Sequence, residues 1–201
     1  RLGQAIQLDT KEYHKVFQIG RVTCYFIPAG HILGSAQVVI ECEGKRAIVT
    51  GDYKLSPDNT VDAFEHLECD LLVTESTFAL PCFKWPSEEL VFAEIHTFWQ
   101  ENQAKGLHTV LYAYSLGKAQ RLLAGLDHQQ GPIAVHGAVD EMNQIYKSFG
   151  KLELLPPRLT LEAMASWKLP GLVIAPPSTT GSAWLKKLKK YREAYVSGWM
   201  Q

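Results

Sequence analysis

Short runs of β-branched and apolar residues dominate the first part of the chain. Residues 36–42 and 46–50 are two such runs, and the turn-forming sequence at residues 43–45 separates them. This pattern predicts a β-hairpin. Residues 16–27 alternate more loosely and predict an earlier hairpin, and residues 70–74 have the pattern of a buried strand. The first part is therefore expected to be a series of consecutive strands.

The pattern changes near residues 80 and 81, where we place a domain boundary between residues 1–80 and 81–201. Beyond it, apolar residues recur at helical spacing near residues 90–99, 116–126 and 142–149. Short apolar strands alternate with these helices. A β-α-β-α order predicts a mostly parallel sheet covered by helices, so the fold class is α/β. The expected strands are residues 109–114, 133–135, 172–175 and 194–197.

Composition places the chain among ordinary globular proteins. Of its 201 residues, 46% are hydrophobic and 20% are charged. No apolar run is long enough to span a membrane, and no signal peptide is apparent. The four cysteines form no Cys-x-x-Cys pair, which argues against a zinc knuckle or a redox motif and favours a cytoplasmic location. Because the chain begins with Arg1, we expect it to be a fragment.

The small net charge of −1 is unevenly distributed. Residues 1–80 hold 7 Lys and Arg against 11 Asp and Glu, whereas residues 81–201 hold 13 against 10. An acidic half beside a basic half is consistent with a metal site next to a surface that binds a polyanion. An offset of this size also arises by chance, so both interpretations stay open.

Three side chains that can bind a metal or handle a proton lie beside predicted strands. His31 precedes the first strand of the hairpin, Asp52 follows the second strand, and Glu75 ends the strand at residues 70–74. A hairpin of this length can bring His31 and Asp52 to one edge of the sheet. Imidazole nitrogen and carboxylate oxygen are the ligands of hydrolytic metal sites. The alternative is a loop histidine and a turn-forming aspartate.

The segments around these residues resemble those of a known family. They are residues 29–31 with 34–36, residues 51–54, and residues 74–77. Together they are similar to the β-CASP nucleases of the metallo-β-lactamase superfamily. Residues 74–81 and the later Trp85-Pro86 resemble the bacterial ligase-associated DNA exonucleases of that family. The resemblance implies a partial metallo-β-lactamase core of the αββα type in residues 1–80 and a β-CASP nucleic-acid-binding α/β domain in residues 81–201.

The resemblance also implies two zinc ions in the complete protein. Residue by residue, His31 matches a metal ligand, Asp52 matches the carboxylate that bridges the two metals, and Glu75 matches an acid that supports the site without touching the metal. The His-x-His-x-Asp-His motif and the late histidine of the family are missing. We therefore expect these 201 residues to carry part of a metal site and to be inactive alone.

Two loops of the second domain are expected to contact nucleic acid. Ser115, the predicted N-cap of a helix, and Lys118 lie at a strand-to-helix junction, a place that attracts phosphate. Ser178 and Thr179 lie in a hydroxyl-rich loop that precedes a predicted basic helix. The alternative is an ordinary helix cap and a solvated basic face. The basic residues are Lys186, Lys187, Lys189, Lys190 and Arg192.

These features predict metal-dependent hydrolysis of phosphodiester bonds in nucleic acid. The first hypothesis is a DNA exonuclease that acts in DNA repair with a DNA ligase. One alternative is an RNA 3′-end processing nuclease of the same fold, and another is a non-catalytic module that binds nucleic acid. A thioester or lactam hydrolase is a weaker alternative, because such an enzyme does not need an appended α/β domain. The sequence does not separate DNA from RNA substrates.

Overall fold

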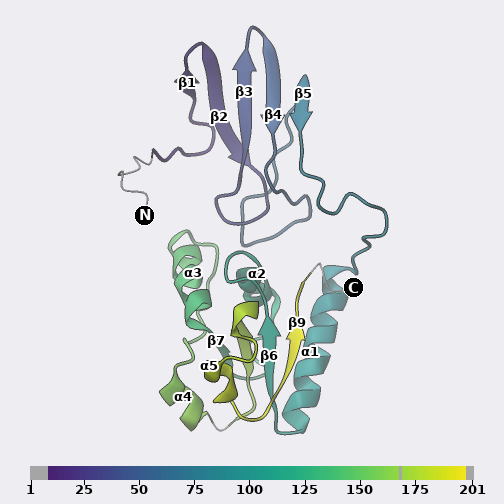
Figure 1. The fold of residues 1–201 in the computed structure, drawn as a ribbon, viewed down its shortest axis with the longest axis vertical. Coiled ribbons are helices and arrows are strands. Elements are labelled where there is room, and N and C mark those ends of the chain that lie inside the picture. Colours follow the sequence, from purple (N-terminus) through teal and green to yellow (C-terminus); the bar gives the residue numbers. More distant parts are fainter. Residues whose placement is uncertain (1–8, 168, 198–201) are drawn as a thin grey trace. The chain divides into compact units, whose positions relative to one another are not determined.

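The computed structural model of the chain describes residues 9–167 and 169–197 (Figure 1). These residues form two compact units, one that extends to Thr77 and one that starts at Phe78. The division lies close to the expected boundary at residues 80 and 81. In the described part of the chain, no helix combines the length and the apolar character needed to cross a bilayer.

The first unit is built on one five-stranded sheet with the strands in sequence order. Its first four strands are antiparallel neighbours, and the last pairs with β4 in parallel. The predicted hairpin is confirmed, with Glu43 and Gly44 at positive φ in its two-residue turn, as such turns require. The strands are β1 (Phe17–Ile19), β2 (Val22–Pro28), β3 (Ala36–Cys42), β4 (Lys45–Val49) and β5 (Leu71–Val73).

The core of this sheet is formed by one residue from each of the three central strands. Ile27, Val39 and Ile48 are 0%, 0% and 2% exposed and pack together. They lie at the middle or end of their strands, where the register brings Val39 opposite Ile48. Burial of such aliphatic side chains stabilises the sheet by roughly 1.5–3 kcal/mol each.

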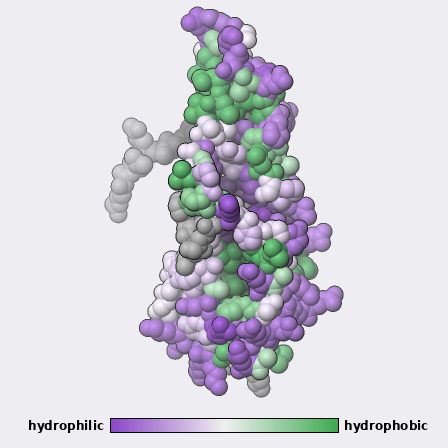
Figure 2. All heavy atoms as spheres, turned by 90° about the vertical axis from the view of Figure 1, so that its right-hand side faces the viewer, coloured by the Kyte–Doolittle hydropathy of each residue, from purple (hydrophilic) through white to green (hydrophobic). Residues whose placement is uncertain are grey.

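The prediction of a buried strand at residues 70–74 is wrong in its burial. Leu71, Leu72 and Val73 form β5, but all three are at least half exposed. The strand is at the edge of the sheet, and no helix is present among the described residues of this unit to cover it. Figure 2 shows hydrophobic residues at the surface of the first unit on the side where Figure 1 draws β5.

The second unit contains the predicted parallel sheet, which confirms the α/β class. Its four strands are all parallel, in the order β7-β8-β6-β9. The last strand begins and ends earlier than the sequence indicated. The strands are β6 (His108–Tyr112), β7 (Ile133–Val135), β8 (Leu172–Ala175) and β9 (Tyr191–Tyr195).

Helices connect these strands. Helix α1 packs against β6 and α3 packs against β8, so the central strands are buried, as is usual for parallel sheets. The helix predicted to begin after Pro86 does so, with Ser87 as its N-cap. The helices are α1 (Glu88–Ala104), α2 (Lys118–Gly125), α3 (Gly137–Ser148), α4 (Leu161–Ser166) and α5 (Ala183–Lys186), with a 3-10 turn, η1 (Pro177–Thr179).

Two local predictions in this unit are wrong. Ser115 is not the N-cap of α2, because Gly117, with φ of 83°, takes that position and its N–H donates to Oε1 of Gln120 at 2.7 Å. The predicted basic helix is also much shorter. Helix α5 ends at Lys186, so the following lysines lie in a loop and Arg192 belongs to β9.

His136 caps α3 through its imidazole. Its Nδ1 accepts a hydrogen bond from the N–H of Ala138 at 3.1 Å, which requires an unprotonated nitrogen. Burial lowers the pKa of His136 below its ordinary value, and the nearby Arg158 lowers it further. As pH falls, the unfolded chain therefore takes up this proton before the folded chain does. The stabilisation is complete above about pH 6.5 and is lost at lower pH.

We therefore expect the second unit to unfold at a lower temperature at about pH 5.5 than at about pH 7.5. Substitution of His136→Asn replaces the capping nitrogen with a capping amide oxygen and removes the titrating group, so it should reduce this pH dependence. His108, whose pKa is also lowered by burial, should account for part of the remaining dependence. Thermal unfolding followed by tryptophan fluorescence measures both effects. Identical pH dependence in the variant and the original chain would contradict the assignment.

Candidate metal centre

The loop that carries His31 is fixed by Ser35. The loop joins β2 to β3, and the backbone N–H of Ala29 closes it by donating to the carbonyl of Ser35 at 3.0 Å. The hydroxyl oxygen of Ser35 accepts hydrogen bonds from the N–H groups of His31 and Ile32, at 3.0 and 3.2 Å. Ser35 therefore holds the backbone on which the imidazole is mounted.

Gly30 allows this loop to approach the next one closely. Its φ is +73°, and a Cβ at this position would lie 2.4 Å from the carbonyl oxygen of Lys54. The N–H of Lys54 donates to the carbonyl of Ala29 at 3.1 Å. The His31 loop and the segment after β4 therefore make direct backbone contact, which any side chain at residue 30 would prevent.

The segment after β4 is also anchored at its far end. Lys54 forms an ion pair with Asp58, whose side chain is 5% exposed. Burial by itself would raise the pKa of Asp58, but hydrogen bonds from Lys54 and Thr60 lower it overall, so the carboxyl group is ionised at neutral pH. Lys54 thus fixes the segment through both its backbone and its side chain.

His31 and Asp52 meet at the end of this sheet. Nε2 of His31 is 4.0 Å from Oδ2 of Asp52, and the two side chains are 44% and 72% exposed. This separation is longer than a hydrogen bond. The nitrogen and the oxygen therefore face the same space, open to solvent, without bonding to each other. Two donors in this arrangement can share a cation.

Glu75 lies near the same point. Its Oε2 accepts a hydrogen bond from the N–H of Thr77 at 3.0 Å. Hydrogen bonds from Thr77 lower the pKa of Glu75, and the nearby His31 lowers it further. Glu75 is therefore a carboxylate at neutral pH and is close enough to the imidazole to interact with it electrostatically.

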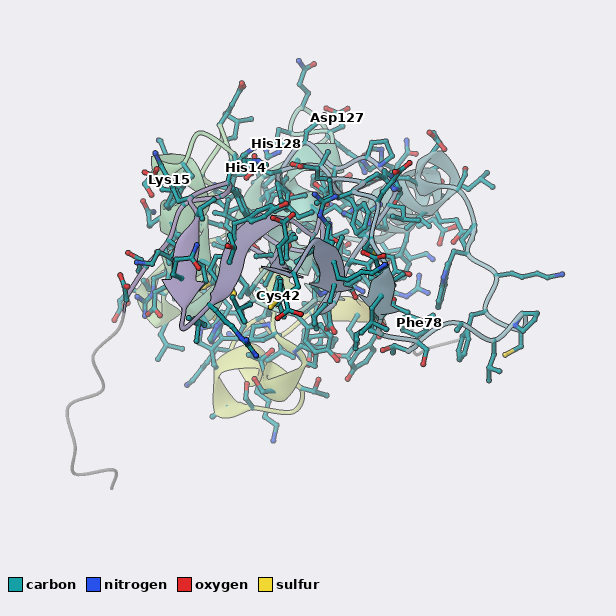
Figure 3. The ribbon with its side chains drawn as sticks, turned by 90° about the horizontal axis from the view of Figure 1, so that it is seen from above. His14, Lys15, Cys42, Phe78, Asp127 and His128 are labelled. Carbon is teal, nitrogen blue, oxygen red and sulfur yellow. The ribbon has the colours of Figure 1, made fainter. Side chains whose placement is uncertain are left out.

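The donor chemistry fits zinc, but the number of donors is small. Catalytic zinc sites use three protein ligands, commonly His nitrogens and carboxylate oxygens. Across the described ranges, no group of three or more His, Cys, Asp and Glu side chains is arranged to hold a metal ion. Two other histidines, both labelled in Figure 3, have partners elsewhere. Nε2 of His14 is 3.3 Å from Oε2 of Glu65, and Nε2 of His128 is hydrogen-bonded to the carbonyl of Leu123. A complete centre would need ligands in addition to His31 and Asp52.

The junction before α2 differs from the one that the sequence indicated. The N–H groups of Gly117, Lys118 and Ala119 all donate within the unit, so they do not offer free donors to a phosphate. Burial lowers the pKa of Lys118, and the nearby Arg121 adds to this effect. Ser115 and Lys118 are both partly buried. The backbone N–H of Lys118 is engaged within the unit, so its side chain is the group that remains as a candidate contact to nucleic acid.

Of the two residues predicted to contact nucleic acid in the hydroxyl-rich loop, one is exposed to solvent. Ser178 is exposed, but Thr179 is 6% exposed and its hydroxyl donates to the carbonyl of Pro176 at 2.8 Å. The five basic residues that follow this loop are all exposed, and Arg192 is also hydrogen-bonded to Asn102 of α1 at 3.2 Å.

A pocket that the sequence did not predict lies at the carboxyl end of the parallel sheet. It has a volume of about 300 Å³ and is formed by the ends of β6 and β9 and the start of η1. The signal in the sequence was Tyr114, a large aromatic residue at the end of the expected strand at residues 109–114, which in the structure lies beyond the end of β6. The lining residues are Tyr112, Ala113, Tyr114, Pro177, Tyr195, Val196 and Ser197.

Comparison with known proteins reveals several relatives, although no protein-family profile matches the chain. A probable DNA ligase of Opitutus terrae is 32% identical over 203 residues, which cover 96% of this chain and 19% of the relative. Endoribonuclease YSH1 of Eremothecium gossypii is 30% identical over 125 residues, or 60% of this chain and 16% of the relative. An RNase J-like protein of Methanocaldococcus jannaschii is 27% identical, over 62% of this chain and 32% of the relative.

A solved structure supports the fold as a whole. A protein of unknown function from Enterococcus faecalis V583 superimposes with a TM-score of 0.60 and 11% sequence identity. The match covers 97% of this chain and 57% of the other. The chain spans about a fifth of the probable DNA ligase and about a third or less of the other two curated relatives.

The close approach at Gly30 gives a direct test of this geometry. Gly34→Ala should cost about 1–2 kcal/mol, because Gly34 is at φ of +79° but has open space around it. Gly30→Ala should cost more, because its new methyl group would also meet the backbone of Lys54. Amide hydrogen exchange in β2 and β3 measures the difference.

The second unit provides an internal control, because all five tryptophans lie after Thr77. Tryptophan fluorescence should therefore report the same unfolding for both glycine variants. Equal losses of exchange protection in Gly30→Ala and Gly34→Ala would contradict the close approach of the two loops.

Proposed function

This chain belongs to the β-CASP nucleases of the metallo-β-lactamase superfamily, and on this basis we propose that it forms part of a metal-dependent nuclease that hydrolyses phosphodiester bonds in nucleic acid. The observation that carries the proposal is the 4.0 Å separation of the His31 imidazole and the Asp52 carboxylate. Both side chains are exposed, and both are mounted on loops fixed by backbone contacts.

The three residues have distinct proposed roles. His31 and Asp52 would bind zinc, with Asp52 as the carboxylate shared by two ions. Bound zinc supplies a hydroxide nucleophile at neutral pH and stabilises negative charge on the attacked phosphate. Glu75, ionised and held by Thr77, would orient a ligand or a proton-carrying histidine. A complete zinc site would need further ligands in addition to His31 and Asp52.

The substrate is proposed from the relatives. The similarity to a probable DNA ligase extends over 96% of this chain, which favours DNA and an exonuclease that works with a ligase in DNA repair, in the cytoplasm. The relatives named as endoribonucleases favour the alternative, an RNA 3′-end processing nuclease, over 60% of the chain. Matched DNA and RNA substrates would separate these two possibilities.

A second candidate is a non-catalytic module that binds nucleic acid. It is favoured by the finding that two metal donors, and not three, converge in the part of the chain that the structure describes. Both candidates assign nucleic-acid binding to the second unit. The proposed contacts are Ser115, Lys118, Ser178 and the exposed lysines at residues 186–190. Thr179 would hold the loop that carries Ser178 in place through its hydrogen bond to the carbonyl of Pro176.

The first test is substitution of Asp52→Asn in the complete protein. It removes a ligand charge without changing the size of an exposed side chain, so nuclease activity should fall by more than the roughly 10–100-fold typical of residues that only support a metal site. The folded state should persist, as measured by thermal unfolding. Glu43→Gln, in the turn at the far end of the hairpin, is the control and should retain activity. Unchanged cleavage by Asp52→Asn would refute the nuclease proposal.

The second test concerns the lysines after the hydroxyl-rich loop. If Lys186 and Lys187 contact phosphates, replacing both with Gln should flatten the plot of log affinity against log salt for single strands by up to about 1.4, or 0.7 per contact. Affinity is measured by titration of this chain with an oligonucleotide at several salt concentrations. Replacement of Lys105 and Lys147, which are exposed elsewhere, is the matched control. An unchanged slope would show that Lys186 and Lys187 form only a solvated face.

A further inference from the structure

Among the described residues that line the pocket at the carboxyl end of the second sheet, none is charged. Two of its residues, Tyr114 and Tyr195, are 57% and 40% exposed, so their rings are available to a ligand. The other lining groups are mainly apolar, from alanine, proline and valine, with a single serine. The pocket therefore favours a flat, uncharged group over a phosphate.

The topology of the sheet explains why a pocket forms here. Strands β8 and β6 are neighbours, but the chain leaves β6 for β7 on one side and leaves β8 for β9 on the other. Each connection passes beyond the other strand, so the two run in opposite directions along the sheet. Because crossovers between parallel strands are right-handed, the loops that follow β6 and β8 leave toward opposite faces of the sheet and diverge there. In open parallel sheets, ligands bind in the crevice that such divergence creates at the carboxyl ends of the strands. Tyr114 and Pro177 come from these two loops.

Two of the three tyrosine rings that line the pocket, those of Tyr112 and Tyr195, are held in place before any ligand binds. The hydroxyl of Tyr195 is hydrogen-bonded to that of Thr180 at 2.8 Å, and its ring centroid is 4.7 Å from that of Tyr112. The hydroxyl of Tyr112 donates to Glu193 at 2.7 Å. Burial, together with this bond, raises the pKa of Tyr112, so it remains a donor. Fixed rings lose little conformational entropy when a ligand stacks on them.

The charges near the pocket disfavour a phosphate and favour an uncharged nucleobase as its ligand. The carboxylate of Glu193 accepts the hydrogen bond from the Tyr112 hydroxyl, so a negative charge lies next to a residue of the pocket and would repel a phosphate. An aromatic face instead attracts any nucleobase, since every base presents a π-face for stacking. A pocket of about 300 Å³ is at the small end of ligand sites, which suits one base and not a duplex. Bases in a duplex are also covered by their neighbours, so the base must be unpaired.

We propose that this pocket is a subsite for one unpaired nucleobase of a single-stranded substrate, with Tyr114 as the exposed stacking platform. The proposal rests on the proposed nuclease function and specifies that the second unit binds nucleic acid in its single-stranded form. Two roles are assigned to this surface: the pocket binds a base, and the adjoining side chains of Ser115, Lys118 and Ser178 bind the sugar-phosphate backbone.

The test measures binding by this chain. The probe is a single-stranded oligodeoxythymidine of about eight nucleotides with a fluorescent label, alongside an RNA oligonucleotide of the same length and an abasic version of each. Tyr114→Ala should weaken binding of the intact oligonucleotide by about 5- to 100-fold, the range for loss of one base-stacking contact. Tyr114→Phe, which keeps the ring, should bind as the original chain does.

Two controls separate stacking from other effects. Phe149→Ala removes an aromatic side chain that is 68% exposed at the end of α3 and does not line the pocket, so affinity should not change. The abasic oligonucleotides should bind Tyr114→Ala and the original chain equally. Tryptophan fluorescence during unfolding verifies that each variant is folded.

The outcomes distinguish this inference from the proposed function. If the original chain binds but Tyr114→Ala binds equally well, or loses the same affinity for the abasic strand, the base subsite is refuted and the nuclease proposal stands. If the original chain binds neither DNA nor RNA strands, both the subsite and the assignment of nucleic-acid binding to the second unit are refuted. Loss of affinity confined to strands that carry bases, and to Tyr114→Ala, supports the subsite.

Discussion

The close contact between two loop backbones at Gly30 is the constraint on which the candidate metal centre depends. The carbonyl of Lys54 occupies the space where any other residue would place a Cβ, and the Lys54 N–H bonds to the carbonyl of Ala29. This contact joins the loop that follows β2 to the segment that follows β4. His31 and Asp52 lie at 4.0 Å because their two loops are held together there. Backbone geometry therefore positions the two candidate donors before any ligand is added.

The sequence was most informative where a residue type has one physical role. The two-residue turn at Glu43 and Gly44, the start of α1 after Ser87 and the parallel sheet follow from turn chemistry, capping and apolar runs. The meeting of His31 and Asp52 could also be anticipated, because a hairpin of known length returns the chain to the same edge. The exposure of residues 71–73 could not be anticipated. A short apolar run looks alike in the sequence whether its strand is covered or lies uncovered at the edge of a sheet.

The surface of the second unit was harder to anticipate, because it depends on which hydrogen-bond partner each side chain takes, and some of these partners are far apart in the chain. Gln120 bonds to the N–H of Gly117, the carbonyl of Ser115 and the side chain of Asn143, and so moves the start of α2 from the serine to the glycine. The carbonyl of Pro176 takes the hydroxyl of Thr179, which local sequence alone does not reveal. The pocket between Tyr114 and Tyr195 requires the order of the four strands, which is a property of the whole sheet.

The uncovered strand β5 has a consequence for how this chain behaves in solution. An edge strand presents a row of backbone donors and acceptors, and in β5 that row carries three aliphatic side chains that are at least half exposed. Such an edge is a template for the addition of another extended segment. Its three-residue length limits the template to a few hydrogen bonds. Concentrated preparations of the chain should accordingly self-associate through this edge, and a charged residue in place of Leu72 is the change that would keep them monodisperse.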